Sequence, residues 1–289
     1  MKRHLILIRQ RRSHPRDDIE VKLSIKTMMK RFALVYLVLL MGFIAPAALA
    51  QNTKLALVGN IVPTLIDKAP FSARANNVVK QALNNYAVSI TATTQAWSGS
   101  GLRNGTFVGF IDHYSLNAQR PDYLYSNPYM VLPLHIASRL PKAIETNRLD
   151  KIYRTSLGIE NRFANTDELR SERSVRWART PDFLANIKQL ADRRVENIIA
   201  DKFMLEAFNK LLIEASYEPM YLSRQPIYEV ELRLAIKIDT PNAQTIIDQF
   251  NASLSVLTAS GELNKLINPV IDSTSQLDEA LYQEIVRKW

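Results

Sequence analysis

Arg120 stands among side chains that could together recognise a small anion. The stretch from Asn104 to Tyr129 reads NGTFVGFIDHYSLNAQRPDYLYSNPY, so a strand-like run ends in small polar and ionisable residues shortly before Arg120. An aromatic-Ser-x-Pro-Tyr segment follows the arginine. A buried guanidinium surrounded by hydrogen-bonding side chains can bind a carboxylate through two parallel hydrogen bonds. We therefore expect the binding chemistry of the chain to centre on this stretch.

Two titratable residues precede Arg120 at the end of the strand-like run. Asp112 could pair with Arg120 and weaken its hold on a carboxylate, or it could recognise a cationic ligand. His113 can change its charge near neutral pH, although a lone histidine is more often a hydrogen-bonded residue of a core or a rim. Arg120 could instead form a surface or structural ion pair with Asp122. Both interpretations of the arginine stay open at this point.

The first 50 residues have the pattern of an exported protein. Met28 to Arg31 is a short basic segment, and residues 32–50 form an apolar run that ends in Ala-Leu-Ala. A basic segment, an apolar run and a small-residue exit together predict a cleavable secretory signal. A membrane anchor is the alternative because the run approaches the lower length limit for a span. Pro46 and the small-residue exit favour cleavage, so we expect a cut after Ala50 and a periplasmic protein.

The excess of basic residues lies in this leader. Residues 1–27 precede an otherwise complete signal, so we interpret them as the product of a start codon placed too early, with Met28 or Met29 as the true start, or as a cytoplasmic extension. The chain has 37 basic and 28 acidic residues, and removing the 10 and 3 in residues 1–50 leaves 27 and 25. The formal charge therefore falls from +9 to about +2, which removes the argument for nucleic-acid binding.

The mature chain alternates between strand and helix patterns, which predicts an α/β fold. Expected strands lie at 53–58, 86–93, 107–111, 131–138, 156–159, 175–178, 195–200 and 228–236. Expected helices lie at 73–83, 97–102, 166–171, 180–193, 202–212, 242–260 and 277–287. The chain contains no cysteine, and a chain of this length can bury a core without disulfides.

Several residues mark where these elements begin, end or cross. Thr180 is expected to be the N-cap of its helix, with Pro181 as the first helical residue. Gly261 is expected to end the helix before it. Pro133 interrupts the strand 131–138, and because proline prefers the edge or first position of a strand, this strand could cross between two domains.

Three groups of residues follow one another in the order of a known family. They are Ile111–Ser115 with Arg120 and Tyr125–Tyr129; Ile187–Ala191 with Arg194–Glu196 and Asp201; and Ala235–Lys237 with Phe250-Asn251 and Ser260–Leu263. In this order and spacing the mature chain resembles bacterial extracellular solute-binding protein family 3, the periplasmic receptors of polar amino-acid ABC transporters. The resemblance implies a two-lobed, type II periplasmic-binding-protein-like fold in which each lobe is a central mixed sheet flanked by helices. Lobe one would comprise 53–132 and 228–289, and lobe two 135–222, joined by a hinge.

The resemblance also implies roles for particular side chains. Arg120 matches the lobe-one arginine that clamps a ligand α-carboxylate, and Ser115 matches a position that offers a hydroxyl. Asp201 matches the lobe-two aspartate that pairs with an α-ammonium, although an Asp there is also an ordinary N-cap, and both roles can hold. Trp97 is a candidate for an apolar wall against the ligand, or else a packed core residue.

The sequence departs from the family pattern at both sides of the expected cleft. Asp112 and His113 stand where these receptors usually have small hydroxyl residues. The usual Gly-Thr-Thr element of lobe two falls near Arg162-Phe163-Ala164, where Asn161 or Arg162 could take its place. The ligand is therefore expected to be a small polar, amino-acid-like or carboxylated solute that the sequence does not name.

These features predict a binding protein and not an enzyme. It would capture its solute between the lobes for uptake by an inner-membrane ABC permease, as a monomer without cofactor, metal or nucleic acid. One alternative is a ligand-free or sensory module on the same fold, since the Gly-Thr-Thr element is missing. Another is a periplasmic dehydratase-like enzyme in which Asp112, His113 or Glu160 acts as acid or base.

Overall fold

The computed structural model describes residues 54–60, 73–93, 95–152, 155–269, 287 and 289, all of which belong to the unit Asn52–Trp289. The predicted extension 1–27, the signal peptide 28–50, its cleavage site after Ala50 and most of the predicted helix 277–287 lie outside the described residues. Across the described ranges, no helix has the length and apolar character that a membrane span requires.

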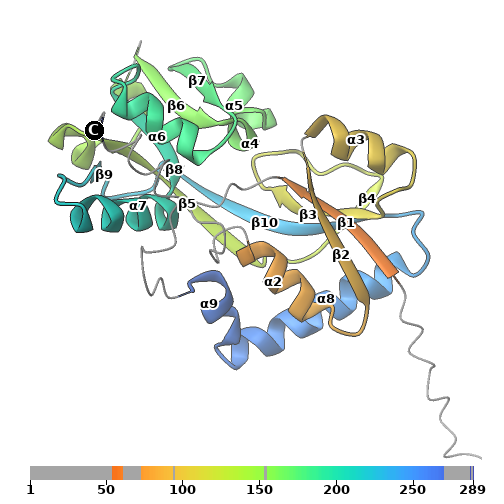
Figure 1. Ribbon diagram of the computed structural model, residues 1–289. Coiled ribbons are helices and arrows are strands. Elements are labelled where there is room, and N and C mark those ends of the chain that lie inside the picture. Colours follow the sequence, from red (N-terminus) through yellow and green to blue (C-terminus); the bar gives the residue numbers. More distant parts are fainter. Residues whose placement is uncertain (1–53, 61–72, 94, 153–154, 270–286, 288) are drawn as a thin grey trace, which may run out of the picture. The chain divides into compact units, whose positions relative to one another are not determined.

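Strands and helices largely alternate along the chain (Figure 1). The first half contains β1 (Lys54–Asn60), α2 (Ala73–Ala82), β2 (Ala87–Thr93), α3 (Gln95–Arg103), β3 (Gly109–Tyr114), β4 (Tyr123–Tyr125), β5 (Met130–Ser138) and the short 3-10 helices η1 (Pro141–Glu145) and η2 (Leu149–Ile152). The second half contains β6 (Ser156–Glu160), α4 (Asn161–Ala164), α5 (Asp167–Ser171), β7 (Arg176–Thr180), α6 (Phe183–Ala191), β8 (Asn197–Asp201), α7 (Lys202–Glu214), β9 (Tyr221–Leu222), β10 (Tyr228–Lys237), α8 (Ala243–Ala259) and α9 (Glu262–Ile267). The alternation is interrupted where β3, β4 and β5 follow one another, as do β9 and β10.

One mixed sheet connects the described strands in the order β2-β1-β3-β10-β5-β8-β6-β7, with β4 beside β10 and β9 beside β5. Besides β9, which pairs with Ala137 and Ser138, strand β5 has two longer antiparallel partners along its length. Its residues Met130–Leu134 pair with β10, and Leu134–Ser138 pair with β8. The strand predicted to cross between domains is therefore paired with strands from both predicted lobes, while the lobe boundaries themselves remain a prediction.

Two groups of apolar side chains form the main cores. Helices α2, α8 and α9 pack against one another, and the first core includes Val78, Val79, Leu83, Ile246, Ile247, Phe250 and Leu254. The second core lies around α6, α7 and β8 and includes Phe183, Ile187, Leu190, Phe208, Leu211 and Leu212. Burying apolar surface stabilises the fold by about 25 cal/mol per Å², so these helix faces hold the sheet and its loops in place.

The prediction for the start of the helix at 180–193 is wrong. The N-cap of α6 is Asp182, whose carboxylate accepts a hydrogen bond from the backbone N–H of Ala185 at 2.8 Å. Thr180 instead ends β7, and its hydroxyl donates to the carbonyl oxygen of Ile159 at 3.1 Å. Aspartate is as good an N-cap as threonine, so the cap two residues later leaves Thr180 available to the sheet.

The end of that helix agrees more closely with the prediction, since α6 stops at Ala191 and the expected end was about Arg193. At the other predicted stop, Gly261 follows α8 with a φ of 75°, the left-handed conformation that favours glycine. A short helix that the sequence did not predict, α9, begins directly after it.

Candidate functional site

A cavity of about 220 Å³ lies where several strands end beside the first turn of α2. In open α/β sheets, ligands commonly bind at the carboxyl ends of strands. Residues from β1, β3 and β8 reach this cavity at or near those ends, and α2, α4 and α7 contribute side chains from their first turns. The described polar residues that line it are Asn60, Arg74, Asn76, Asp112, Tyr114, Arg162 and Asp201.

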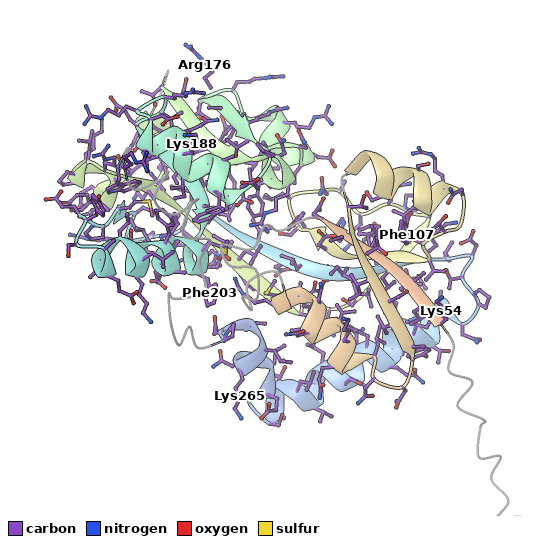
Figure 2. All side chains as sticks on the ribbon, in the orientation of Figure 1. Lys54, Phe107, Arg176, Lys188, Phe203 and Lys265 are labelled. Carbon is purple, nitrogen blue, oxygen red and sulfur yellow. The ribbon has the colours of Figure 1, made fainter. Side chains whose placement is uncertain are left out.

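Arg74 and Asp201 form a buried ion pair in this cavity. The Nη1 of Arg74 donates to Oδ2 of Asp201 at 2.8 Å, and the two side chains are 7% and 3% exposed. The Nε of Arg74 also donates to the carbonyl oxygen of Ile267 at 2.7 Å. Its guanidinium lies over the ring of Phe203, 4.1 Å from the ring centroid; Figure 2 labels Phe203. Three contacts therefore fix the orientation of Arg74.

Arg162 is held by a second buried ion pair. Its Nε and Nη2 donate to the two carboxylate oxygens of Glu160 at 2.9 and 3.1 Å, which is a bidentate arrangement. The guanidinium also lies over the ring of Phe163, 4.4 Å from the centroid. Burial alone would lower the pKa of Arg162, but Glu160 and Tyr114 beside it hold that pKa above its usual value. Arg162 is therefore a fixed cation.

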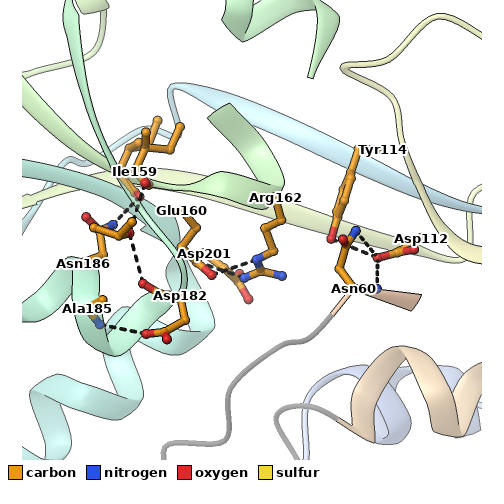
Figure 3. Close-up of polar contacts among 12 residues, drawn as sticks. Asn60, Asp112, Tyr114, Ile159, Glu160, Arg162, Asp182, Ala185, Asn186 and Asp201 are labelled. Atoms are coloured by element: carbon orange, nitrogen blue, oxygen red, sulfur yellow. Dashed lines mark hydrogen bonds and ion pairs between the residues drawn. The ribbon is translucent and has the colours of Figure 1, made fainter. Parts of the chain in front are cut away.

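Asp112 is held from the other side of the cavity (Figure 3). Its Oδ2 accepts hydrogen bonds from the backbone nitrogen of Asn60 at 2.9 Å and from the side-chain Nδ2 of Asn60 at 2.7 Å. The hydroxyl of Tyr114 donates to the same oxygen at 3.4 Å. Burial raises the pKa of Asp112, while the bonds from Asn60 and the charge of Arg162 oppose that rise.

Tyr114 lies between the two charged groups. Figure 3 shows its side chain between Arg162 and Asp112. Burial raises the pKa of the Tyr114 hydroxyl, and the neighbouring carboxyl of Asp112 raises it further. The hydroxyl therefore stays protonated at neutral pH and acts as a neutral hydrogen-bonding group. Among the described residues, no group of three or more His, Asp or Glu side chains could hold a metal ion.

Comparison with known proteins gives matches among solved structures. No family model matches the chain, and no curated protein matches it. The GluR0 ligand-binding core in complex with L-glutamate matches with a TM-score of 0.57 at 12% identity, covering 74% of this chain and 96% of that one. The amino acid ABC transporter substrate-binding protein AbpA from Streptococcus pneumoniae, bound to L-arginine, matches with a TM-score of 0.54 at 13% identity, covering 83% and 98%.

A third match is AncCDT-1, an ancestral amino-acid-binding protein and a precursor of cyclohexadienyl dehydratase. Its TM-score is 0.53 at 14% identity, and the match covers 74% of this chain and 93% of that one. The chain has the type II periplasmic-binding-protein fold. The fold class and the resemblance predicted from the sequence are thus confirmed at the level of the fold.

Within this fold the structure brings two of the predicted site residues together. Asp112 and Asp201 both line the cavity. Asp201 is also the N-cap of α7, because its Oδ1 accepts the backbone N–H of Phe203 at 3.3 Å. The N-cap role that the sequence offered for Asp201 is therefore confirmed, and its contact with a ligand remains a prediction.

The other predicted site residues do not line this cavity. Arg120 is 62% exposed and pairs with Asp122 at 2.8 Å, the alternative that the sequence left open. Ser115 is exposed, and its hydroxyl accepts the backbone N–H of Glu231 at 3.0 Å. Their contacts with a ligand remain predictions that this geometry does not favour.

His113 and Trp97 occupy different surroundings. Alternate side chains of a strand point to opposite faces, so His113 on β3 points away from Asp112. Its ring is buried 4.5 Å from that of Tyr125, and burial and the charge of Arg233 lower its pKa. Trp97 belongs to α3, but its side chain lies outside the part of the chain that the structure describes.

Sequence reasoning did not single out Arg74, Asn60 or Tyr114. A pattern in α2 could have identified the arginine, because Arg74 lies four residues before Val78 and eight before Ala82, on one helix face. Both apolar residues are buried. A charged residue on a buried face needs a partner, so its position could have indicated a carboxylate nearby.

Proposed function

We propose that the chain is a solute-binding protein that holds one small, carboxylate-bearing molecule in this cavity. The observation that carries the proposal is the set of buried and half-buried charges of both signs, Arg74, Arg162, Asp112 and Asp201, around one small space. Pockets for drug-sized ligands occupy roughly 300–1,000 Å³. A cavity of about 220 Å³ fits a solute of amino-acid size and is too small for a folded peptide.

The fold supports the same proposal. Its matches include proteins whose structures hold L-glutamate and L-arginine, which favours an amino-acid-like solute here. The predicted secretory leader favours a periplasmic location, and the predicted partner is an inner-membrane ABC permease. In the proposed mechanism no bond is made or broken: the solute binds the closed form more tightly than the open form, so binding shifts the population toward closure.

A thermal-shift screen of the common amino acids and small carboxylates tests this proposal. Because the solute binds only the folded protein, a concentration of 100 times Kd should raise the unfolding free energy by about 2.7 kcal/mol. Arg162→Gln should abolish the shift, since it removes the fixed cation of the cavity. The matched control is Arg176→Gln, at an exposed arginine on β7, and it should respond like the wild type.

The outcomes separate this proposal from the ligand-free module. If the protein is folded but no compound in the screen stabilises it, the ligand-free interpretation is favoured, since Arg74, Arg162 and Asp112 already have partners within the protein. If a compound stabilises the wild type and Arg162→Gln equally, binding occurs elsewhere and the cavity is the wrong site.

A dehydratase-like activity is the second candidate. Asp112 favours it, because burial raises the pKa of this carboxyl and a general acid needs a raised pKa. The match to a dehydratase precursor also favours it. Incubation with prephenate tests it directly. Formation of product by the wild type and not by Asp112→Asn would replace the binding proposal with an enzymatic one.

A further inference from the structure

The two aspartates of the cavity differ in how the protein uses their oxygens. Asp201 has both oxygens engaged, Oδ2 by Arg74 at 2.8 Å and Oδ1 by the N–H of Phe203 at 3.3 Å. The contacts to Asp112 from Asn60 and Tyr114 all fall on Oδ2. In the described part of the chain none of these contacts uses Oδ1 of Asp112, so this oxygen can accept a hydrogen bond from a ligand.

The two arginines of the cavity differ in the same way. Arg74 is engaged through Nη1 by Asp201, through Nε by the carbonyl oxygen of Ile267 and across its face by Phe203. Arg162 bonds Glu160 along one edge of the guanidinium, through Nε and Nη2. A guanidinium has five N–H donors; the bonds to Glu160 use two of them, Tyr114 is a further hydrogen-bond partner, and the remaining donors can bind a ligand.

On the basis of the function proposed above, we propose that the ligand is a zwitterion whose carboxylate binds Arg162 and whose ammonium binds Asp112. This orientation is opposite to the one that the family resemblance implies, in which Arg120 holds the carboxylate and Asp201 the ammonium. Arg120 is exposed and paired with Asp122, and Asp201 is neutralised by Arg74. In this orientation Arg162 of α4 binds the carboxylate and Asp112 of β3 binds the ammonium.

The charges and the remaining hydrogen-bond donors together favour a zwitterion over a simple ion. Within the described lining of the cavity, Asp201 neutralises Arg74, and Glu160 next to the lining neutralises Arg162. Asp112 is bonded only by the neutral groups of Asn60 and Tyr114 in the contacts above. A simple carboxylate would place a second negative charge near Asp112, and a simple amine would leave the donors of Arg162 unused. A zwitterion supplies an ammonium to Asp112 and a carboxylate to the remaining donors of Arg162.

The test compares ligands that differ by one charge. The probes are the common amino acids and an ω-amino acid series from glycine through β-alanine and 4-aminobutanoate to 5-aminopentanoate, with affinities measured by calorimetry. For 4-aminobutanoate the matched compounds are butanoate, which lacks the ammonium, and butylamine, which lacks the carboxylate. The variants are Asp112→Asn, which preserves the shape of the side chain, and Asp122→Asn, the same change in an exposed aspartate.

The proposal expects a zwitterion to bind the wild type more tightly than either singly charged analogue. Removing one partner of a buried charge pair commonly costs enough to lower affinity about 30-fold or more, so Asp112→Asn should weaken zwitterion binding by that factor. It should not weaken carboxylate binding and should strengthen it modestly, because that analogue lacks the group that Asp112 recognises and the change removes a nearby negative charge. Asp122→Asn should bind every probe like the wild type.

Three results would overturn the proposal in distinguishable ways. If a zwitterion binds, Asp112→Asn keeps its affinity and Arg120→Ala loses it, the orientation is wrong while the binding function stands. If a carboxylate without an ammonium binds the wild type more tightly than its zwitterion, the ligand class is wrong and the binding function again stands. If no probe binds the folded wild type, the proposed function fails and this inference fails with it.

Discussion

The guanidinium of Arg74 and the carboxylate of Asp201 are joined by a 2.8 Å hydrogen bond, although the two residues are 127 positions apart in the sequence. Arg74 lies in the first turn of α2, and Asp201 ends β8 and caps α7. Both side chains are almost fully buried and both line the cavity. The pair therefore connects distant segments at the site where a solute would bind.

Breaking this pair is expected to destabilise the protein strongly. Arg74→Met or Asp201→Asn leaves one buried charge without its partner, which costs about 3–5 kcal/mol of unfolding free energy, measured by urea denaturation. Changing both residues to Met and Leu should cost less than the sum of the single changes, because no charge is then left unpaired.

The pair of Arg120 and Asp122 is the matched control for that experiment. Its N–O distance is also 2.8 Å, but its side chains are 62% and 48% exposed. Arg120→Met or Asp122→Asn should therefore change the unfolding free energy by less than about 1 kcal/mol. Equal losses in the two pairs would show that burial does not decide the strength of the Arg74 contact.

Stability should depend on pH through Asp112. Burial raises the pKa of this carboxyl above its usual value of 3.8, so the folded state binds the proton more tightly than the unfolded state. The contribution of Asp112 to stability is therefore fully present below the usual pKa and is lost as the pH rises through the folded-state pKa.

Asp112→Asn removes this dependence because an amide does not titrate. The unfolding free energy of the variant minus that of the wild type should increase as the pH rises above about 4 and level off above the folded-state pKa of Asp112. Urea denaturation at a series of pH values measures it. A difference that stays constant or falls with pH would contradict the raised pKa.

The helices and strands were largely predictable from the sequence because their information is local. Val78, Val79 and Ala82 mark one face of α2 through helical spacing, and all three are buried. Alternation in Tyr228–Ile236 marked β10 in the same way. The start of α6 was mispredicted because Thr180 and Asp182 are both good N-caps, and only the pairing of β7 with β6 decides between them.

The site was only partly predictable because it depends on contacts between distant segments. Asp112 and Asp201 were predicted and line the cavity, but the sequence does not show that Arg74 reaches Asp201. Nor does it show that Arg120 is exposed, with its backbone N–H donating to the hydroxyl of Tyr125 at 2.9 Å. A family motif therefore located the region of the site more reliably than it assigned the side chains.

Arg120→Ala tests whether the motif or the geometry is the better guide to ligand binding. Because Arg120 is exposed and lies outside the described lining of the cavity, its loss should change the affinity of a bound amino acid by less than about 2-fold, as expected for a distant site. Calorimetry with the best compound of the screen measures this. A loss as large as that of Arg162→Gln would restore the role that the resemblance implies for Arg120.

Gly109 is expected to control how closely β3 packs against β10. A Cβ at this position would overlap the backbone carbonyl oxygen of Ala235 and lie 2.9 Å from Cδ1 of Ile236. The carbonyl cannot easily move, since Ile236 and Ala235 of β10 pair with Gly109 and Phe110 of β3. Gly109→Ala should therefore lower the unfolding free energy by about 1–3 kcal/mol, as other overpacked sites do.

The same change should weaken ligand binding, because a shift of β3 also moves Asp112, three residues further along the strand. Gly99→Ala is the control: Gly99 lies inside α3, and the nearest atom that its new Cβ would meet is the flexible end of Arg103 at 3.4 Å. Alanine favours a helix over glycine by about 1 kcal/mol, so this variant should be as stable as the wild type or more so. If Gly109→Ala were equally stable, the close approach of β3 and β10 would not hold Asp112 in place.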